Sequence, residues 1–263
     1  MNVKVFLKFI CRILIWPFSL LGRGSCLPVS SGYRILSSAD EWRPASEKAW
    51  NTPEVAKRQH RAYQALVRQA RLGAPRVDLA AAAQALSFTG EINPRLLEVG
   101  CGSGYYSEIF KILFKKPIQY YGVDNSEAMI SLARRRYPGL FFQIADATHL
   151  PFKDGEFNVV FNCASLMHIL NYASAISESR RLSCGWCIFQ TVTVLQNKPT
   201  TFLEKKAYGF RTFEIVFNEE ELYRQFERNR LKVEHVLPSI PYDLIDLLGE
   251  PTKSNTYVCR VLK

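Results

Sequence analysis

A carboxylate and three glycines at alternate positions lie near the middle of the chain, as Glu98, Gly100, Gly102 and Gly104. Glycine lets a backbone turn tightly and approach a ligand without a Cβ in the way. A helix that begins near Tyr105 would present free N–H groups to the same ligand. The carboxylate would repel a pyrophosphate, but it suits a ligand that carries an ammonium group. The spacing therefore predicts a nucleotide-type binding turn for a ligand with a positive charge.

The dinucleotide fingerprint G-x-G-x-x-G is the main alternative for such a turn. Here the position that this fingerprint needs as glycine is Tyr105. Tyr105 and the early acid Glu98 both oppose an NAD-dependent oxidoreductase, an interpretation that nicotinamide-cofactor binding would restore. The pattern Glu98-x-Gly100-x-Gly102-x-Gly104 instead resembles motif I of the class I S-adenosylmethionine (SAM)-dependent methyltransferases.

Three further segments follow in the order of that family. Asp124 ends a strand expected over 118–123, and an acid at this place can bind both ribose hydroxyls. The run 145–152 resembles the family's adenine-binding segment, in which an acid accepts from the exocyclic amine. The run 163–169 resembles the loop of motif IV. The resemblance covers roughly residues 95–194.

The resemblance implies SAM as the cofactor, no metal, and a role for each matching residue. A structural turn is the alternative for each glycine, and a helix cap or a surface acid is the alternative for each aspartate. The implied residues are Glu98, Gly100, Gly102 and Gly104 for the methionine part, Asp124 for the ribose, Asn125 and Met129 for the adenine face, Asp146 and Ala147 for the adenine edge, and Asn162 for the motif IV wall.

The catalytic residue stays open, with His168 as the candidate. This histidine lies in the motif IV region, and an ordinary imidazole pKa of ~6.5 would permit proton removal near neutrality. Methyl transfer to a soft or already ionised nucleophile needs no base, however, and a single histidine is more often structural.

The elements around these residues predict an α/β fold. The resemblance implies a Rossmann-like, seven-stranded, mostly parallel sheet in the order 3-2-1-4-5-7-6, with strand 7 antiparallel, helices on both faces and an N-terminal helical extension. Residues 195–217 are expected as an insertion, and residues 22–38 as a linker. The expected strands are 96–99, 118–123, 140–144, 157–162, 185–194, 231–237 and 256–262.

The positive charge is concentrated at the start of the chain. The formal net charge is +10, and residues 1–76 hold thirteen Lys/Arg and four Asp/Glu, which gives +9. The rest of the chain carries +1, so nucleic acid is not expected as a partner.

The segment 3–21 is apolar apart from Lys4, Lys8, Arg12 and a serine. Cations four residues apart share one helix face, which is typical of an anchor lying in the plane of an anionic membrane surface. The interrupting charges and Pro17 disfavour a spanning helix, and no signal-peptide cleavage site follows. A helix packed on its own domain is the alternative. The expected organisation is 1–21 as a membrane-surface segment, 22–75 as linker and helical lid, and 76–263 as the methyltransferase domain.

A helix from Thr52 to about Leu72 precedes the glycine turn. Trp50, Gln59 and Tyr63 are lid candidates, and the basic face of this helix is expected to be solvated. The pair Cys184 and Cys187 lies where a helix passes into a strand, which disfavours a redox or zinc site and favours reduced thiols in a cytoplasmic protein.

These observations predict a SAM-dependent methyltransferase that acts by in-line displacement on a small-molecule acceptor or one linked to a lipid or glycan. The resemblance is to the small-molecule branch that includes quinone and lipid biosynthesis enzymes, because 162–165 lacks the motif IV signatures of nucleic-acid enzymes. The alternative is a catalytically inactive methyltransferase-like binding module at a membrane-associated assembly. The expected location is the cytoplasm, with peripheral contact to the inner face of the membrane.

Overall fold

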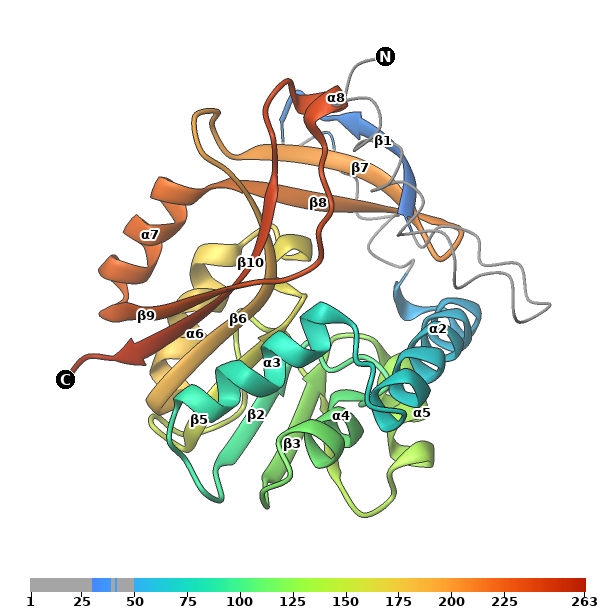
Figure 1. Cartoon of the computed structure of the whole chain (residues 1–263), viewed down its shortest axis with the longest axis vertical. Helices are drawn as coiled ribbons and strands as arrows, with labels where there is room; N and C mark the ends of the chain where they lie inside the picture. Colours follow the sequence, from blue (N-terminus) through green and yellow to red (C-terminus); the bar gives the residue numbers. More distant parts are fainter. Residues whose placement is uncertain (1–29, 39–40, 42–49) are drawn as a thin grey trace.

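The computed structural model of the chain describes residues 30–38, 41 and 50–263 (Figure 1). The expected anchor at 3–21 therefore lies outside the described residues. Seven strands form a mixed sheet in the order β4-β3-β2-β5-β6-β10-β9, and β10 is antiparallel to both of its neighbours. This confirms the expected order 3-2-1-4-5-7-6. The strands are β2 (Arg95–Val99), β3 (Gln119–Asp124), β4 (Phe141–Ile144), β5 (Phe157–Cys163), β6 (Ser183–Leu195), β9 (Leu231–Pro238) and β10 (Lys253–Val261).

Helices cover both faces of this sheet, because successive strand residues point to opposite sides. Leu96 packs into a core with α3, α4 and α5, whereas Leu97 and Val99 pack into a second core with α6 and α7. The bounds are α3 (Val77–Phe88), α4 (Tyr106–Leu113), α5 (Glu127–Arg136), α6 (Tyr172–Leu182) and α7 (Glu219–Arg228), with the short helices η3 (Leu166–His168) and α8 (Ile245–Leu248).

Three strands form an additional antiparallel layer in the order β1-β7-β8. The expected insertion folds as a hairpin of β7 (Thr201–Ala207) and β8 (Phe210–Asn218), which joins the main sheet where β8 pairs with the last residues of β6. β1 (Ser30–Ile35) pairs with β7, so the expectation of a linker over 22–38 is wrong for residues 30–35. The described chain thus has ten strands rather than seven, because the insertion forms a hairpin and β1 becomes a strand by pairing with it.

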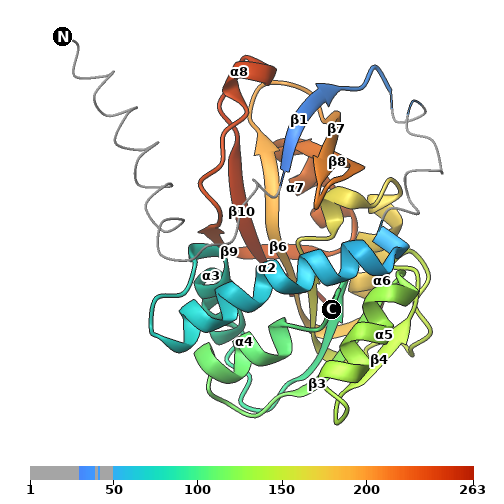
Figure 2. The same cartoon turned by 90° about the vertical axis from the view of Figure 1, so that its right-hand side faces the viewer.

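Helix α2 (Pro53–Arg71) crosses the molecule between the hairpin and helices α4 and α5 (Figure 2). Thr52 caps its start by accepting a hydrogen bond from the Val55 amide, and Gly73 follows its end with φ +80°. The bounds expected for this helix are confirmed.

Within the part of the chain that the structure describes, none of the helices is both long enough and apolar enough to cross a membrane. The five described cysteines are free, and Cys184 alone of these is exposed.

Candidate functional site

The glycine turn joins β2 to α4, and its conformation favours glycine. Gly100, Gly102 and Gly104 have φ values of +74°, +51° and +77°, which L side chains rarely adopt. A Cβ on Gly104 would also lie 2.6 Å from the Phe142 ring. The turn is fixed to the next strand, since the amides of Gly100 and Cys101 both donate to the Val123 carbonyl at 2.9 Å.

Asp124 stands at the end of β3, beside this turn. Its Oδ2 accepts from the Gly102 amide at 2.8 Å, and its Oδ1 accepts from the Ser126 amide at 2.9 Å. Burial raises the pKa of this carboxyl, and the two backbone hydrogen bonds oppose the rise. The carboxyl is therefore held in one orientation between the turn and the start of α5, where a ribose would lie by resemblance.

Glu98 lies beneath the turn with no exposed surface. Its Oε2 accepts from the Tyr120 hydroxyl, whereas its Oε1 has no hydrogen-bond partner among the described residues. Burial raises the pKa of Glu98 to about 8, against the lowering effect of the Tyr120 hydrogen bond. At neutral pH this group is therefore largely protonated.

The residues implied for the adenine differ in their exposure. Asp146 and Asn125 are exposed, and Asp146 accepts from the amide and hydroxyl of Thr148 at 2.8 Å each. Ala147, in the same turn, is half-buried. Met129 is 2 % exposed and packs against α2, so its side chain faces the lid in this structure.

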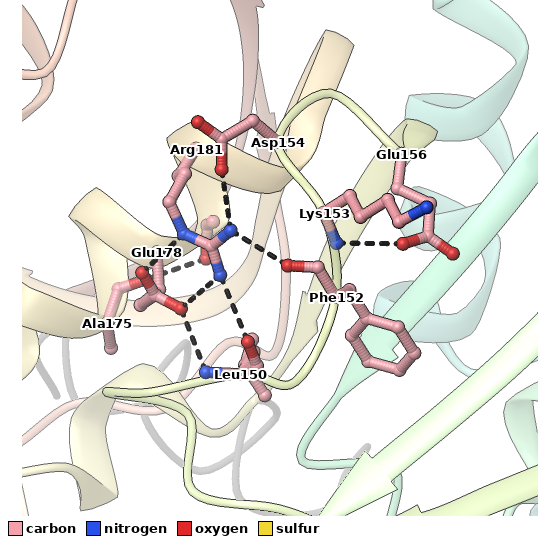
Figure 3. A network of polar contacts seen from close by, with 9 residues as sticks. Leu150, Phe152, Lys153, Asp154, Glu156, Ala175, Glu178 and Arg181 are labelled. Atoms are coloured by element: carbon pink, nitrogen blue, oxygen red, sulfur yellow. Dashed lines mark hydrogen bonds and ion pairs between the residues drawn. The ribbon is translucent and has the colours of Figure 1, made fainter.

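The loop that carries Asp146 is clamped onto α6 by Arg181 (Figure 3). The Arg181 guanidinium donates to the Leu150 and Phe152 carbonyls and to the carboxylates of Asp154 and Glu178, at 2.7 to 3.0 Å. Glu178 in turn accepts from the Leu150 amide at 2.8 Å. This clamp positions the segment that follows β4.

The Asn162 side chain lies on the α6 side of the sheet, opposite the face that carries Glu98. Its amide donates to the Ser179 hydroxyl of α6 at 3.1 Å, and its side chain is 1 % exposed. Its neighbour Cys163 lies on the Glu98 face instead, with Sγ 3.8 Å from the Tyr105 hydroxyl. The Asn162 side chain is thus engaged within the core.

His168 faces the inserted hairpin. Its Nδ1 lies 2.6 Å from the Phe213 carbonyl, so Nδ1 carries the proton and Nε2 carries the lone pair. Burial, aided by the nearby Lys205 ammonium, lowers the pKa of His168 to about 4. The Trp50 ring lies 5.6 Å from the imidazole, between centroids. His168 is therefore neutral at physiological pH and has a lone pair that can accept a proton.

The hairpin brings a buried ion pair close to His168. Lys205 of β7 pairs with Glu214 of β8, and Glu214 also accepts from the Tyr242 hydroxyl at 2.7 Å. At the other side, the Trp50 indole donates to the Thr212 hydroxyl at 3.0 Å. No sequence signal indicated that this segment would cover the motif IV loop.

The lid candidates all lie at the site. Trp50 accepts, through its carbonyl, from the Ser126 hydroxyl at 2.7 Å, and Tyr63 stacks on Tyr105 with centroids 3.9 Å apart. Gln59 touches the turn at Gly102. Sequence reasoning missed His60, whose Nδ1 lies 3.2 Å from the Ser103 hydroxyl. Its position directly after Gln59 and one helical turn before Tyr63 and Gln64 was the available signal.

The unpartnered buried atoms near the turn fit SAM. Gln59 Oε1 is a hydrogen-bond acceptor without a donor among the described residues, and Glu98 Oε1 also has no partner there. SAM offers donors of that kind in its ammonium group, ribose hydroxyls and adenine amine. Within the described residues, no group of three or more His, Cys, Asp or Glu side chains could hold a metal ion.

Comparisons with known proteins also point to SAM-dependent methyltransferases. Residues 97–189 match the family described as "Methyltransferase domain". The demethylmenaquinone methyltransferase of Chlorobaculum parvum is 29 % identical over 121 residues, which are 45 % of this chain and 48 % of that protein. The phthiotriol/phenolphthiotriol dimycocerosates methyltransferase of Mycobacterium tuberculosis is 42 % identical over 71 residues, 26 % of each chain. The chain spans less than half the length of the curated relatives that it matches here.

Solved structures show the same fold. A SAM-dependent methyltransferase from Thermotoga maritima superposes with a TM-score of 0.51 at 20 % identity, over 80 % of this chain and 98 % of that one. The geranyl diphosphate C-methyltransferase of Streptomyces coelicolor, solved with S-adenosyl-L-homocysteine, superposes with a TM-score of 0.52 at 15 % identity, over 69 % and 75 %. The chain thus has the fold of these enzymes, and residues 97–189 match the methyltransferase domain family.

Proposed function

We propose that this chain is a SAM-dependent methyltransferase that acts on a small-molecule or lipid-linked acceptor. The observation that carries the proposal is the placement of Asp124. Its carboxylate is held by the Gly102 amide at the end of β3, beside a turn in which three glycines have positive φ. This contact between an acid and a glycine turn, within the segment that matches the methyltransferase domain family, supports a ribose-binding role for Asp124.

SAM, when bound, supplies a methyl group on a positively charged sulfur. The chain has to orient its ligands and exclude water, which are the tasks of a group-transfer site without a covalent intermediate. Asp124 and the glycine turn would hold the ribose and methionine parts, and α2 with Trp50 would close the site from solvent. The remaining residues proposed for SAM are Glu98, Asn125, Met129, Asp146 and Ala147, together with the backbone of β5 at Asn162, whose side chain lies on the α6 side of the sheet.

His168 is the proposed proton acceptor for those acceptors that need one. Its Nδ1 is fixed by the Phe213 carbonyl, which leaves Nε2 as the basic atom. Because its pKa is about 4, His168 is a weak base. It therefore suits an acidic hydroxyl, such as a phenol, better than an aliphatic alcohol.

The names of some relatives and structural neighbours support one class of acceptor. The names of two relatives and one structural neighbour refer to demethylmenaquinone, to phthiotriol and phenolphthiotriol dimycocerosates, and to geranyl diphosphate. All three are apolar or carry an apolar part. We therefore propose an acceptor with an apolar part, presented at a membrane surface.

Membrane contact is proposed to use residues 3–21 and the exposed cations of α2 and α5. Arg61 and Arg68 on α2 and Arg136 on α5 are exposed, and within the described residues no carboxylate pairs with them, whereas Arg71 pairs with Glu108. Unpaired cations of this kind favour an anionic lipid surface.

Vesicle sedimentation with the full chain tests this contact. We expect binding to phosphatidylcholine vesicles only when phosphatidylserine is added, and weaker binding when Lys4, Lys8 and Arg12 are changed to Glu. Arg228→Glu, an exposed position on α7, is the control. Equal binding by the triple variant and the wild type would contradict the proposal.

The enzyme proposal is tested by calorimetric titration with SAM and S-adenosylhomocysteine, together with transfer of labelled methyl from SAM to membrane extracts. We expect micromolar binding that Asp124→Ala abolishes, whereas Asp246→Ala, an exposed acid on α8, leaves it unchanged. Binding without transfer to any extract would favour the alternative, a methyltransferase-like binding module. Absence of binding to either compound would refute the enzyme and would also favour this alternative.

A further inference from the structure

Helix α2 contacts the glycine turn through two consecutive residues. The Oε1 atom of Gln59 lies 2.9 Å from the position that a Cβ on Gly102 would occupy. The imidazole of the next residue, His60, lies 3.2 Å from the Ser103 hydroxyl and is 5 % exposed. The carboxamide of Gln59 is therefore held against the surface of the turn, where the methionine part of a bound SAM would lie.

The Gln59 carboxamide oxygen is buried and has no hydrogen-bond donor among the described residues. Buried polar atoms are nearly always hydrogen-bonded, so an orphaned acceptor at a binding turn calls for a donor from a ligand. Among the described residues, Arg95 Nε is the one buried nitrogen donor without a partner, apart from an imidazole nitrogen. Arg95 is the first residue of β2 and lies at the end of that strand away from the glycine turn.

The start of the same helix is tied to the adenine side of the site. The Asn51 side chain accepts from the Ala128 amide at 3.2 Å, and the Trp50 carbonyl accepts from the Ser126 hydroxyl at 2.7 Å. Helix α2 is thus fixed at both the first turn of α5 and the glycine turn. Gln59 reaches the proposed SAM site because α2 lies over that site.

We propose that Gln59 is a donor-binding residue, whose Oε1 accepts a hydrogen bond from the α-ammonium group of SAM when α2 is closed. This inference rests on the proposed function. An ammonium group has three N–H donors and satisfies an acceptor strongly because it is charged. Helix α2 then contributes directly to SAM recognition by binding its amino-acid end.

Three ligands separate this role from a purely structural one. S-adenosylhomocysteine carries both the ammonium and the carboxylate, decarboxylated S-adenosylhomocysteine carries the ammonium alone, and methylthioadenosine carries neither. Calorimetric titration of the full chain would compare the wild type with Gln59→Met, which keeps the size of the side chain, and with Gln59→Glu. Gln69→Ala, on the same helix, is the matched control, and thermal unfolding checks that each variant is folded.

We expect Gln59→Met to weaken binding of both ammonium ligands about tenfold, which is ~1.4 kcal/mol, and to leave methylthioadenosine unchanged. Gln59→Glu should bind the decarboxylated ligand at least as tightly as the wild type, because its charge is opposite. Equal weakening for all three ligands would overturn the inference, as would a loss confined to S-adenosylhomocysteine, which would assign the amide to the carboxylate. No binding by the wild type would refute the proposed function itself, a result distinct from both.

Discussion

The Tyr120 hydroxyl of β3 donates a hydrogen bond to Glu98 of β2, and both side chains are buried beneath the glycine turn. This contact favours the ionised carboxylate, but burial outweighs it and raises the pKa of Glu98 to about 8. An acid that is protonated at neutral pH beneath the glycine turn affects folding and, under the proposed function, ligand binding.

The first prediction concerns stability against pH. Between the ordinary pKa of 4.5 and about 8, Glu98 binds a proton in the folded chain and has lost it in the unfolded chain. The folded state then binds more protons, so the Glu98 contribution to the free energy of unfolding falls as pH rises through this window. We expect Glu98→Gln to gain stability relative to the wild type from about pH 5 to about pH 8, by on the order of 4 kcal/mol at most.

Urea unfolding at several pH values measures this difference. Glu227→Gln, an exposed acid on α7, is the control and should follow the wild type at every pH. A constant difference between Glu98→Gln and the wild type across the window would contradict the predicted protonation of Glu98.

The second prediction concerns proton release on binding. An ammonium group brought close to Glu98 lowers its pKa, so SAM binding should release a proton below about pH 8. We expect the affinity for S-adenosylhomocysteine to rise with pH up to that value. Calorimetry in two buffers of different ionisation enthalpy counts the protons, and Glu98→Gln should release fewer. Equal release by the variant would assign the proton to another group.

The third prediction concerns the glycine turn. Gly104 has φ +77°, and a Cβ there would lie 2.6 Å from Phe142, so Gly104→Ala should destabilise the fold by about 1 to 3 kcal/mol and abolish SAM binding. Gly139→Ala is a matched control, because a Cβ at Gly139 meets nothing within 4 Å. Thermal unfolding and calorimetry compare the two variants. Similar losses for both would show that the strain at Gly104 is relieved elsewhere.

The sequence carried enough information for the main sheet and for Asp124, because the glycine spacing and the strand ends that bear acids are local features. The side of the sheet on which Asn162 lies also follows from a local feature of the sequence. Side chains alternate along a strand, so Phe161 and Cys163 share one face and Asn162 must lie on the other, toward Ser179. This alternation is a local feature as well, and it is sufficient to assign Asn162 to the core on the α6 side of the sheet.

The pairing of β1 with the inserted hairpin could not be predicted in this way. It joins residues more than 160 positions apart, such as Arg34 and Glu204, and nothing local in 30–35 indicates it. The same applies to Phe213, whose carbonyl sets the tautomer of His168 from the far strand of the hairpin. Contacts of this range depend on the folded arrangement of whole elements.

The fourth prediction concerns His168. Its pKa is lowered from 6.5 to about 4, so between these values the unfolded chain binds a proton that the folded chain does not. The contribution of His168 to stability is present above about pH 6.5 and is lost as pH falls toward about 4. His168→Asn keeps a donor for the Phe213 carbonyl and cannot titrate, so it should lose less stability in acid. Urea unfolding from about pH 7 to about pH 4 checks this, with His235→Asn, on β9, as the control. Parallel curves for His168→Asn and the wild type would refute it.

The fifth prediction concerns the clamp at Arg181. Arg181→Ala leaves the carbonyls of Leu150 and Phe152 and the carboxylate of Glu178 without their shared donor, so the loop that bears Asp146 should loosen. Since Arg181 is partly exposed, water replaces some of these contacts, and we expect a loss of about 1 to 3 kcal/mol in the free energy of unfolding.

Adenine binding should weaken as well, because Asp146 loses its fixed position. Urea unfolding and titration with methylthioadenosine measure the two effects, with Arg180→Ala, whose contact is the Leu262 carbonyl, as the neighbouring control. Loss of stability with unchanged methylthioadenosine affinity would show that the Arg181 clamp stabilises the fold without affecting ligand binding.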